Sequence, residues 1–540
     1  MGYRLFNRFA FGLAVIGAPW VCFHAPALAL DGDPLWGEIK VIQVTGPKML
    51  ESPHVVSDGN GGAWVIFTVL KTGTSPDSRF QMINLKSDGS FGKTCPQVTA
   101  RYPHAVPDGA GGLFVAWVEY GTDKVFAARF DPSCGHIWKK PVHVGKLTAP
   151  PAGASPTGEP RVVPDGVGGA YVGWYDRLAH VSNNGQLSTS LNGIDPSKTG
   201  KRIVHLVADR TVGVMFEPLH PPGGWTAQEL PNGSVILKPV HPGLMPWRDA
   251  SAPVPLWKAK FVPGGVIVGW RDQNQDLALQ RIAGGPLWGA AGKTMVVNKP
   301  GTPTDTDWQL VPDGSGGAFV VWVEPPTAAT SLRILVQLLN ASGAEVWSKP
   351  TAVFDASGLG GAWPTNSGQF TGSSLVVAPT GTNQMVVAWQ DYRSGVPSNQ
   401  SDIRARGVDG TGKAFWDATG VLVPFDYDET TPTAENKEDP PCMVSDGQGG
   451  ALFAYNSSAF SKEIGYTRVL ASGNKLVGKW WLIWDDKQDS TGQVQIGLNQ
   501  QLVGMAFDGS GPLPRGAILL WYEFDGQSHH RLFAEKVTVE

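Results

Sequence analysis

Residues 107–117 read Pro107-Asp-Gly-Ala-Gly-Gly-Leu-Phe-Val-Ala-Trp117, a glycine-rich turn followed by a short alternating segment that ends in an aromatic residue. The same phrase returns at residues 57–67, 164–174, 312–322 and 445–455. Weaker copies end at Phe216, Trp270, Trp389 and Trp521. A phrase that returns at a regular interval predicts a repeat architecture, in which the shared residues build the scaffold.

The aromatic residue that closes each copy gives the length of the repeat. Nine positions carry it: Phe67, Trp117, Trp174, Phe216, Trp270, Trp322, Trp389, Tyr455 and Trp521. Their mean spacing is about 57 residues, close to the length of repeats that fold into four strands. In the second repeat, the pattern predicts strands at residues 103–106, 113–120, 124–130 and 136–144, the last carrying Trp138. Such a unit is one blade of a β-propeller.

The sequence therefore predicts an all-β chain that forms a single β-propeller of four-stranded antiparallel blades. Nine repeats are counted, and eight blades result if the weak fourth repeat around residues 208–210 is an insertion. The last repeat ends on its third strand, whereas residues 31–44 resemble a fourth strand, with Trp36 in the place of Trp138. An N-terminal strand that completes the C-terminal blade would close the ring and remove open sheet edges.

The first 29 residues have the features of an export signal. Arg4 and Arg8 precede an apolar run at residues 10–21, and Ala27-Leu-Ala29 offers a cleavage site. We expect residues 1–29 to be a signal peptide and residues 30–540 to be the propeller. No later run is long enough for a membrane-spanning helix. The expected product is a monomer without a membrane span, secreted or periplasmic after cleavage near Ala29.

The charge of the chain argues against nucleic acid as a ligand, and its cysteines favour a disulfide over a metal site. Charged residues make up 17% of the chain and the formal net charge is −4, which disfavours nucleic acid as a ligand. Three cysteines follow the signal segment, and Cys95 and Cys134 are the favoured disulfide because adjacent blades would bring them together. Cys442 is then left over. No cysteine–histidine spacing typical of zinc occurs, so we predict no metal and no cofactor.

The turn aspartates and closing tryptophans are assigned to the scaffold. An Asp side chain accepts hydrogen bonds from turn amides, and Gly allows a positive φ and close approach of neighbours. Calcium binding is the alternative, but each turn offers one carboxylate where calcium needs several oxygen ligands. The residues predicted to be structural are Asp58, Asp108, Asp165, Asp313, Asp446, Asp508, Trp117, Trp174, Trp270, Trp322, Trp389 and Trp521.

With these repeats, the chain resembles secreted bacterial β-propeller proteins with tandem Asp-Gly-x-Gly-Gly-Ala-x-Val-x-Trp-x-Asp repeats. The resemblance covers nearly all of residues 31–540. The phrase is also distantly similar to the Asp-box of sialidase-like propellers, although its spacing differs. The resemblance implies a propeller and carries over no catalytic residue.

An acidic residue follows the closing aromatic in seven repeats, at Glu119, Asp176, Glu217, Asp272, Glu324, Asp391 and Glu523. In a propeller these residues would lie at the ends of the second strands, on one face of the ring. Such a ring of carboxylates could hold a cation or meet a basic partner. Alternatively, each acid pairs with a nearby cation, as the adjacent Asp176 and Arg177 suggest.

The prediction for function is a binding or scaffolding module whose ligand is an extracellular or periplasmic glycan or protein. Besides the acids, the candidate ligand contacts are Trp363, Trp480 and Trp481, because aromatic rings beside carboxylates can grip a sugar or a peptide. The alternative is a polysaccharide hydrolase or lyase that uses a carboxylate pair. No nucleophile elbow, P-loop or zinc-protease motif occurs, so no catalytic residue is assigned and we favour a protein that is not an enzyme.

Overall fold

A computed structural model defines the fold, and it describes a large part of the 540-residue chain. The described residues are 40–42, 48–71, 77–147, 159–174, 177–187, 203–208, 213–218, 225–229, 235–239, 258–271, 276–283, 287–289, 292–295, 308–324, 331–359, 375–391, 402–423, 442–456, 464–472, 499–508, 515–524 and 530–539. The expected signal peptide, residues 1–29, lies outside these ranges and stays a prediction.

Throughout the described ranges the chain is built from β-strands, turns and bends, without a helix. The strands of the first half are β1 (Lys40–Ile42), β2 (Lys48–Ser57), β3 (Ala63–Lys71), β4 (Asp77–Leu85), β5 (Phe91–Thr94), β6 (Val98–Pro107), β7 (Leu113–Glu119), β8 (Lys124–Phe130), β9 (Val142–Lys146), β10 (Arg161–Pro164), β11 (Ala170–Trp174), β12 (Arg177–Val181), β13 (Ile203–Ala208), β14 (Gly213–Pro218), β15 (Trp225–Glu229) and β16 (Val235–Pro239). Those of the second half are β17 (Lys258–Val262), β18 (Gly265–Arg271), β19 (Leu277–Ile282), β20 (Lys293–Met295), β21 (Trp308–Pro312), β22 (Ala318–Glu324), β23 (Arg333–Leu339), β24 (Thr351–Asp355), β25 (Leu375–Gly381), β26 (Gln384–Asp391), β27 (Asp402–Asp409), β28 (Ala414–Phe415), β29 (Val421–Leu422), β30 (Cys442–Ser445), β31 (Ala451–Asn456), β32 (Ile464–Val469), β33 (Asn499–Asp508), β34 (Arg515–Phe524) and β35 (His530–Val539).

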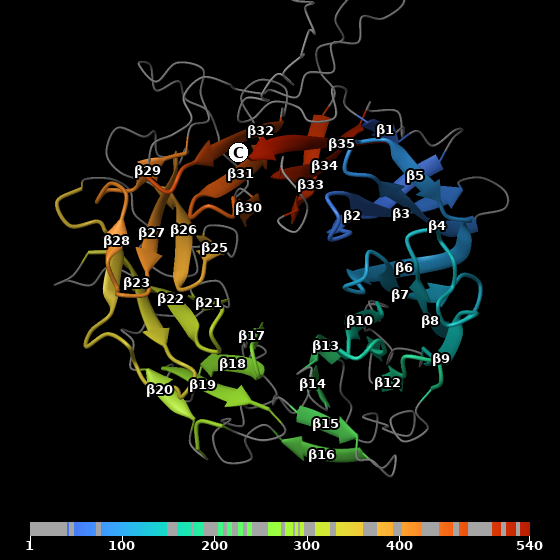
Figure 1. Cartoon of the computed structure of the whole chain (residues 1–540), viewed down its shortest axis with the longest axis horizontal. Helices are drawn as coiled ribbons and strands as arrows, with labels where there is room; N and C mark the ends of the chain where they lie inside the picture. Colours follow the sequence, from blue (N-terminus) through green and yellow to red (C-terminus); the bar gives the residue numbers. More distant parts are fainter. Residues whose placement is uncertain are drawn as a thin grey trace, which may run out of the picture.

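These strands pair in antiparallel order, repeat by repeat. The third to eighth repeats form separate sheets of three to five strands, such as β17-β18-β19-β20 and β21-β22-β23-β24. The first two repeats share one eight-stranded sheet because β4 also pairs with β6. The weak fourth repeat folds as its own four-stranded sheet, β13-β14-β15-β16. The fold is therefore all-β and propeller-like, and its sheets follow one another in chain order around a common centre (Figure 1).

The second strand of each repeat explains why the repeats pack side by side. In β7, Leu113, Val115 and Trp117 lie in a core shared with the first repeat, whereas Phe114 and Ala116 lie in a core shared with the third. Successive side chains of a strand point to opposite faces, so one apolar strand fills two cores. All five are buried. The alternation predicted from sequence is thus present, and both faces of the strand are covered.

The outermost strand differs from the prediction. In the second repeat we expected a continuous strand over residues 136–144, but β9 begins only at Val142. Trp138 instead lies in a bend in which Lys139 has a φ of 63°. The bend lets the indole reach the next repeat, where an added Cβ on Gly185 would lie 2.7 Å from the Trp138 side chain. Turn hydrogen bonds from the amide of Lys139 to the carbonyl of His136 and from the amide of Lys140 to the carbonyl of Trp138 interrupt the strand here.

The two ends of the chain meet in the last sheet. Its order is β1-β35-β34-β33, and Lys40, Val41 and Ile42 of β1 face Ala534, Phe533 and Leu532 of β35. The first and last repeats also share a core that joins Val65 and Phe67 to Leu520 and Leu532. The N-terminal strand thus occupies the fourth-strand position of the last repeat, whereas Trp36 lies outside the described residues.

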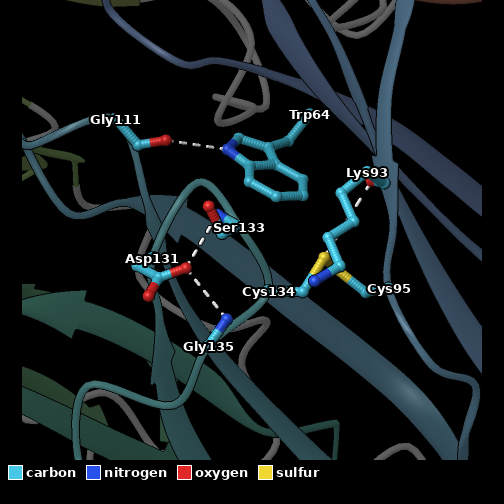
Figure 2. Close-up of a disulfide and its surroundings, with 8 residues drawn as sticks. All are labelled: Trp64, Lys93, Cys95, Gly111, Asp131, Ser133, Cys134 and Gly135. Carbon is cyan, nitrogen blue, oxygen red and sulfur yellow. Dashed lines mark hydrogen bonds between the residues drawn. A yellow bond between two sulfur atoms is a disulfide. The ribbon is translucent and has the colours of Figure 1, made fainter.

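A disulfide joins the first two repeats. Cys95 follows β5 and Cys134 lies in the turn after β8, and their sulfur atoms are 2.09 Å apart (Figure 2). Asp131 holds that turn by accepting hydrogen bonds from the amides of Ser133 and Gly135. This is the pair that the sequence favours, and Cys442 is a free cysteine. No helix in the described ranges has the length and apolar character needed to span a membrane.

Candidate functional site

The repeated Asp-Gly-x-Gly-Gly turn is held by its own aspartate. Oδ1 of Asp108 accepts hydrogen bonds from the amides of Ala110 and Gly112, both at 2.8 Å. The same pair of bonds occurs at Asp58, Asp165, Asp313 and Asp446. One carboxylate oxygen of each turn is therefore used to fix the turn, and the side chain of Asp508 lies outside the described residues.

The other carboxylate oxygen binds a side chain of the same repeat. Oδ2 of Asp108 accepts from Nε of Arg129 at 3.0 Å, and Oδ2 of Asp446 accepts from Nε of Arg468 at 2.9 Å. Oδ2 of Asp165 lies 2.9 Å from Nε2 of His180. Burial alone would raise the pKa of Asp165, but the hydrogen bonds from His180 and the turn amides lower it below its ordinary value.

The same turn is also the joint between repeats. The carbonyl of its fourth residue accepts a hydrogen bond from the preceding repeat: Gly111 from Nε1 of Trp64 at 3.0 Å, as Figure 2 shows, and Gly168 from Nη1 of Arg129 at 3.1 Å. The carbonyl of Gly61 accepts from Nζ of Lys536 at 2.6 Å. Because protein donors occupy both oxygens of Asp108, Asp165 and Asp446, these turns act as scaffold. Among the described residues, no group of three or more His, Cys, Asp or Glu side chains could hold a metal ion.

The tryptophans of the repeat form a second set of joints. The closing residues Trp117, Trp174, Trp322, Trp389 and Trp521 are all buried, and the side chain of Trp270 is not described. Outside the closing position, Nε1 of Trp347 donates to the carbonyl of Gly410 in the next repeat at 3.0 Å. Trp288 and Trp416 make the equivalent bonds to Ala341 and Ala471. The shared aromatic residues therefore hold adjacent repeats together.

The acids that follow the closing aromatic pair with cations of the next strand. Glu119 lies 3.6 Å from Nζ of Lys124, and Asp391, whose side chain is fully buried, lies 3.6 Å from Nε of Arg404. Glu324 is also buried. It faces Arg333 across the β22–β23 pair, binds its guanidinium, and accepts from Nε1 of Trp322 at 3.3 Å. The buried carboxylates of Glu324 and Asp391 are therefore neutralised within their own sheets, whereas the pair of Glu119 and Lys124 is partly exposed.

The remaining predicted contacts cannot be placed at a common site. Asp176, Asp272, Trp363, Trp480 and Trp481 lie outside the described residues. Glu217 and Glu523 lie in β14 and β34, but their side chains are not described. The three acids with described side chains come from three different sheets, and each makes its contacts there.

A different set of residues, on the innermost strands, holds equivalent positions in the strand pairing of the repeats. The first strand of each repeat lies nearest the centre (Figure 1). In each, one residue is paired with the residue just before the closing aromatic, and we call these nine positions the inner row. They are His54, His104, Arg161, Val207, Lys258, Gln309, Val376, Cys442 and Gly504.

His104 is hydrogen-bonded to the third repeat, and two other members of the inner row, Arg161 and His54, lie near enough to affect its pKa. Its Nδ1 accepts a hydrogen bond from the amide of Val162, in the next repeat, at 3.2 Å. Burial, together with the smaller effects of positive charge at Arg161 and His54, lowers the pKa of His104 to about 3. The ring is therefore neutral near pH 7. Because Nδ1 is the acceptor, Nε2 carries the proton and is a donor.

Lys258 and Gln309 form the second group of the inner row. Nζ of Lys258 donates to Oε1 of Gln309 at 3.1 Å and lies 5.5 Å from the ring centroid of Trp308. Both contacts cross from the fifth repeat to the sixth, so the lysine is held between two sheets. In Arg161, by contrast, 48% of the side chain is exposed, and its guanidinium lies 3.3 Å from Glu159.

Hydrophobic pattern analysis misses the inner row because its residues differ from repeat to repeat. The row can be recognised by its distance in sequence from the turn aspartate. Five of its members stand four residues before that aspartate: His54, His104, Arg161, Gln309 and Cys442. A proline precedes four of these five residues. Aligning the repeats on the turn aspartate would therefore have revealed a column of basic and polar residues.

Comparison with known proteins gives structural neighbours only. A scan against protein-family models finds no match, and no curated protein matches in sequence. A eukaryotic initiation factor has a TM-score of 0.42 at 10% identity, covering 81% of this chain and 90% of that one. The WD40 domain of SCAP from fission yeast has a TM-score of 0.39 at 7% identity over 93% and 98% of the two chains.

A third neighbour is the periplasmic gluconolactonase PpgL of Pseudomonas aeruginosa, with a TM-score of 0.31 at 14% identity over 57% of this chain and 85% of that one. At such identities these neighbours carry no information about activity. The account of the fold rests on the strand pairing of the chain itself.

Proposed function

We propose that residues 30–540 form one closed propeller of nine blades, exported after removal of residues 1–29, that acts as a binding or scaffolding module. The pairing of β1 with β35 and the core shared by Phe67 and Leu532 support closure. Phe67 contacts the last repeat in the way that Trp117 contacts the first. The separate sheet β13-β14-β15-β16 supports nine blades over eight.

The observation that supports the binding function is that the shared residues have structural roles, whereas the variable residues of the inner row are available for recognition. The shared aspartates and tryptophans hold turns and join sheets, and the two buried acids after the closing aromatic, Glu324 and Asp391, are neutralised by cations of their own sheets. A glycosidase needs two carboxyl groups with contrasting pKa values on either side of a sugar. The inner row instead offers donors and positive charge, which suit recognition of a ligand.

Paired assays of binding and turnover test this proposal. The mature protein is applied to an array of glycans and to the proteins of the cell envelope, while the same glycans are assayed for released products. We expect saturable binding without product. Catalytic turnover that is abolished by one carboxylate substitution would replace the binding function with a hydrolase or lyase. N-terminal sequencing of the exported protein should give Leu30 as the first residue.

A further inference from the structure

We propose that the inner row binds an oxyanion, namely the carboxylate or phosphate group of a small ligand or of an anionic glycan. This inference rests on the proposed binding function and names the chemical class of its ligand. The site would include His54, His104 and Arg161 on one side of the ring and Lys258 and Gln309 on another.

The first argument is the charge of the row. Two of its nine members, Arg161 and Lys258, are positively charged, three more, His54, His104 and Gln309, have polar side chains, and none is acidic. The chain as a whole carries more acidic than basic residues, 47 against 43, so this composition is opposite to the average. A concentration of one sign of charge on walls of low dielectric raises the local concentration of the opposite ion.

The second argument is that these donors are held in place before any ligand arrives. The Val162 amide fixes the tautomer of His104, and Gln309 and Trp308 hold Lys258 between two sheets. Preorganised donors lose little side-chain entropy on binding, which favours affinity. His104 can donate through Nε2 without taking up a proton. It therefore adds a hydrogen-bond donor without a positive charge that would repel Arg161.

The third argument concerns Arg161. Nearly half of its side chain is exposed, and a guanidinium presents several N–H donors in a plane that matches carboxylate and phosphate oxygens. Glu159, at 3.3 Å, offsets part of its charge, and this contact is itself exposed. Exposed ion pairs are weak, so an anionic ligand can compete for the same guanidinium.

Calorimetric titration of the full mature chain tests the site with defined probes. The probes are inorganic phosphate, citrate, and an oligomer of galacturonate with neutral galactose oligomers as its matched control. We expect saturable binding of at least one anionic probe, none of the neutral oligomer, and weakening as salt rises. Binding of phosphate or citrate identifies a free small anion, whereas binding of the galacturonate oligomer alone identifies a glycan-borne carboxylate.

Two substitutions on different repeats locate the site. Arg161→Gln and Lys258→Gln should each weaken binding at least tenfold, whereas Arg161→Lys, which keeps the charge, should retain part of it. Lys140→Gln removes one exposed lysine from the bend before β9 and should leave binding unchanged. Circular dichroism shows whether each variant is folded. If one variant does not fold, the affinity of the other still tests the site.

Absence of saturable binding by all anionic probes would overturn the inference, as would equal affinities of wild type and both Gln variants. Failure of the proposed function is a separate result. A ligand found on the arrays whose affinity does not change in Arg161→Gln or Lys258→Gln leaves the binding module intact and removes only the oxyanion site.

Discussion

Nζ of Lys536 in β35 donates a hydrogen bond at 2.6 Å to the carbonyl of Gly61, a residue 475 positions earlier in the chain. Gly61 holds the same position in its turn as Gly168, which accepts from Arg129 of the preceding repeat. The last repeat therefore contacts the first in the way that the second contacts the third. Lys536 is 2% exposed, so the contact is part of the core.

Replacement of this lysine tests the joint. Lys536→Met keeps much of the aliphatic chain but leaves the Gly61 carbonyl without its donor in a buried place. Leaving a buried polar group unsatisfied costs about 1–3 kcal/mol. The urea midpoint should therefore fall, whereas Lys140→Met, at an exposed site, should leave it unchanged. Equal midpoints of the two variants would show that the joint adds nothing to stability.

Removal of a closing tryptophan tests the scaffold role of the repeat. Trp322 is 2% exposed and lies in the core between the fifth and sixth repeats. Trp322→Ala should lower the free energy of unfolding by about 3–5 kcal/mol. Ile137→Ala, at a side chain that is 41% exposed, is the control. Thermal melting distinguishes the two, and an unchanged melting point for Trp322→Ala would contradict the packing described here.

The disulfide between Cys95 and Cys134 should add to stability by restricting the unfolded chain. Its sequence separation is 39 residues. A loop of this length corresponds to about 4 kcal/mol in the loop-entropy treatment. The double variant Cys95→Ala/Cys134→Ala should melt lower than wild type, and reductant should lower the melting point of wild type but not of the double variant. Cys442→Ala, which leaves the disulfide intact, should respond to reductant as wild type does.

The buried His104 predicts a dependence of stability on pH. Its pKa is about 3 in the folded chain against an ordinary value of 6.5, so the unfolded chain binds more protons between these values. This contribution is fully present above pH 6.5 and is lost as the pH falls toward 3, by at most about 1.4 kcal/mol per pH unit.

His104→Asn offers an acceptor to the Val162 amide but cannot titrate. Urea unfolding at pH 7 and pH 4.5 should therefore show a smaller loss of stability at the lower pH for the variant than for wild type. Identical losses would mean that His104 is not the group that titrates on unfolding.

The sequence predicts the parts of the fold that repeat. Residues 124–130 form the predicted third strand, and the alternation of β7 appears in its two cores. The partner of Glu324 could not be predicted because it depends on the register that sets Arg333 opposite it. The inner row could not be predicted from the hydrophobic pattern because its residues differ from repeat to repeat, and in β6 an irregular pairing between Arg101 and His104 also shifts the register.

The central claim, one closed ring completed by β1, is tested most directly by removing that strand. We compare a mature chain that begins at Thr45 with one that lacks residues 430–437 and with the intact mature chain. The first change removes the partner of β35 and exposes a sheet edge, which promotes association. Adjacent repeats depend on each other for stability, so the loss should spread from this seam. The chain beginning at Thr45 should unfold at markedly lower urea concentration and elute as aggregates, whereas the loop deletion should match the intact chain. Equal stability of the two deletions would contradict closure by β1.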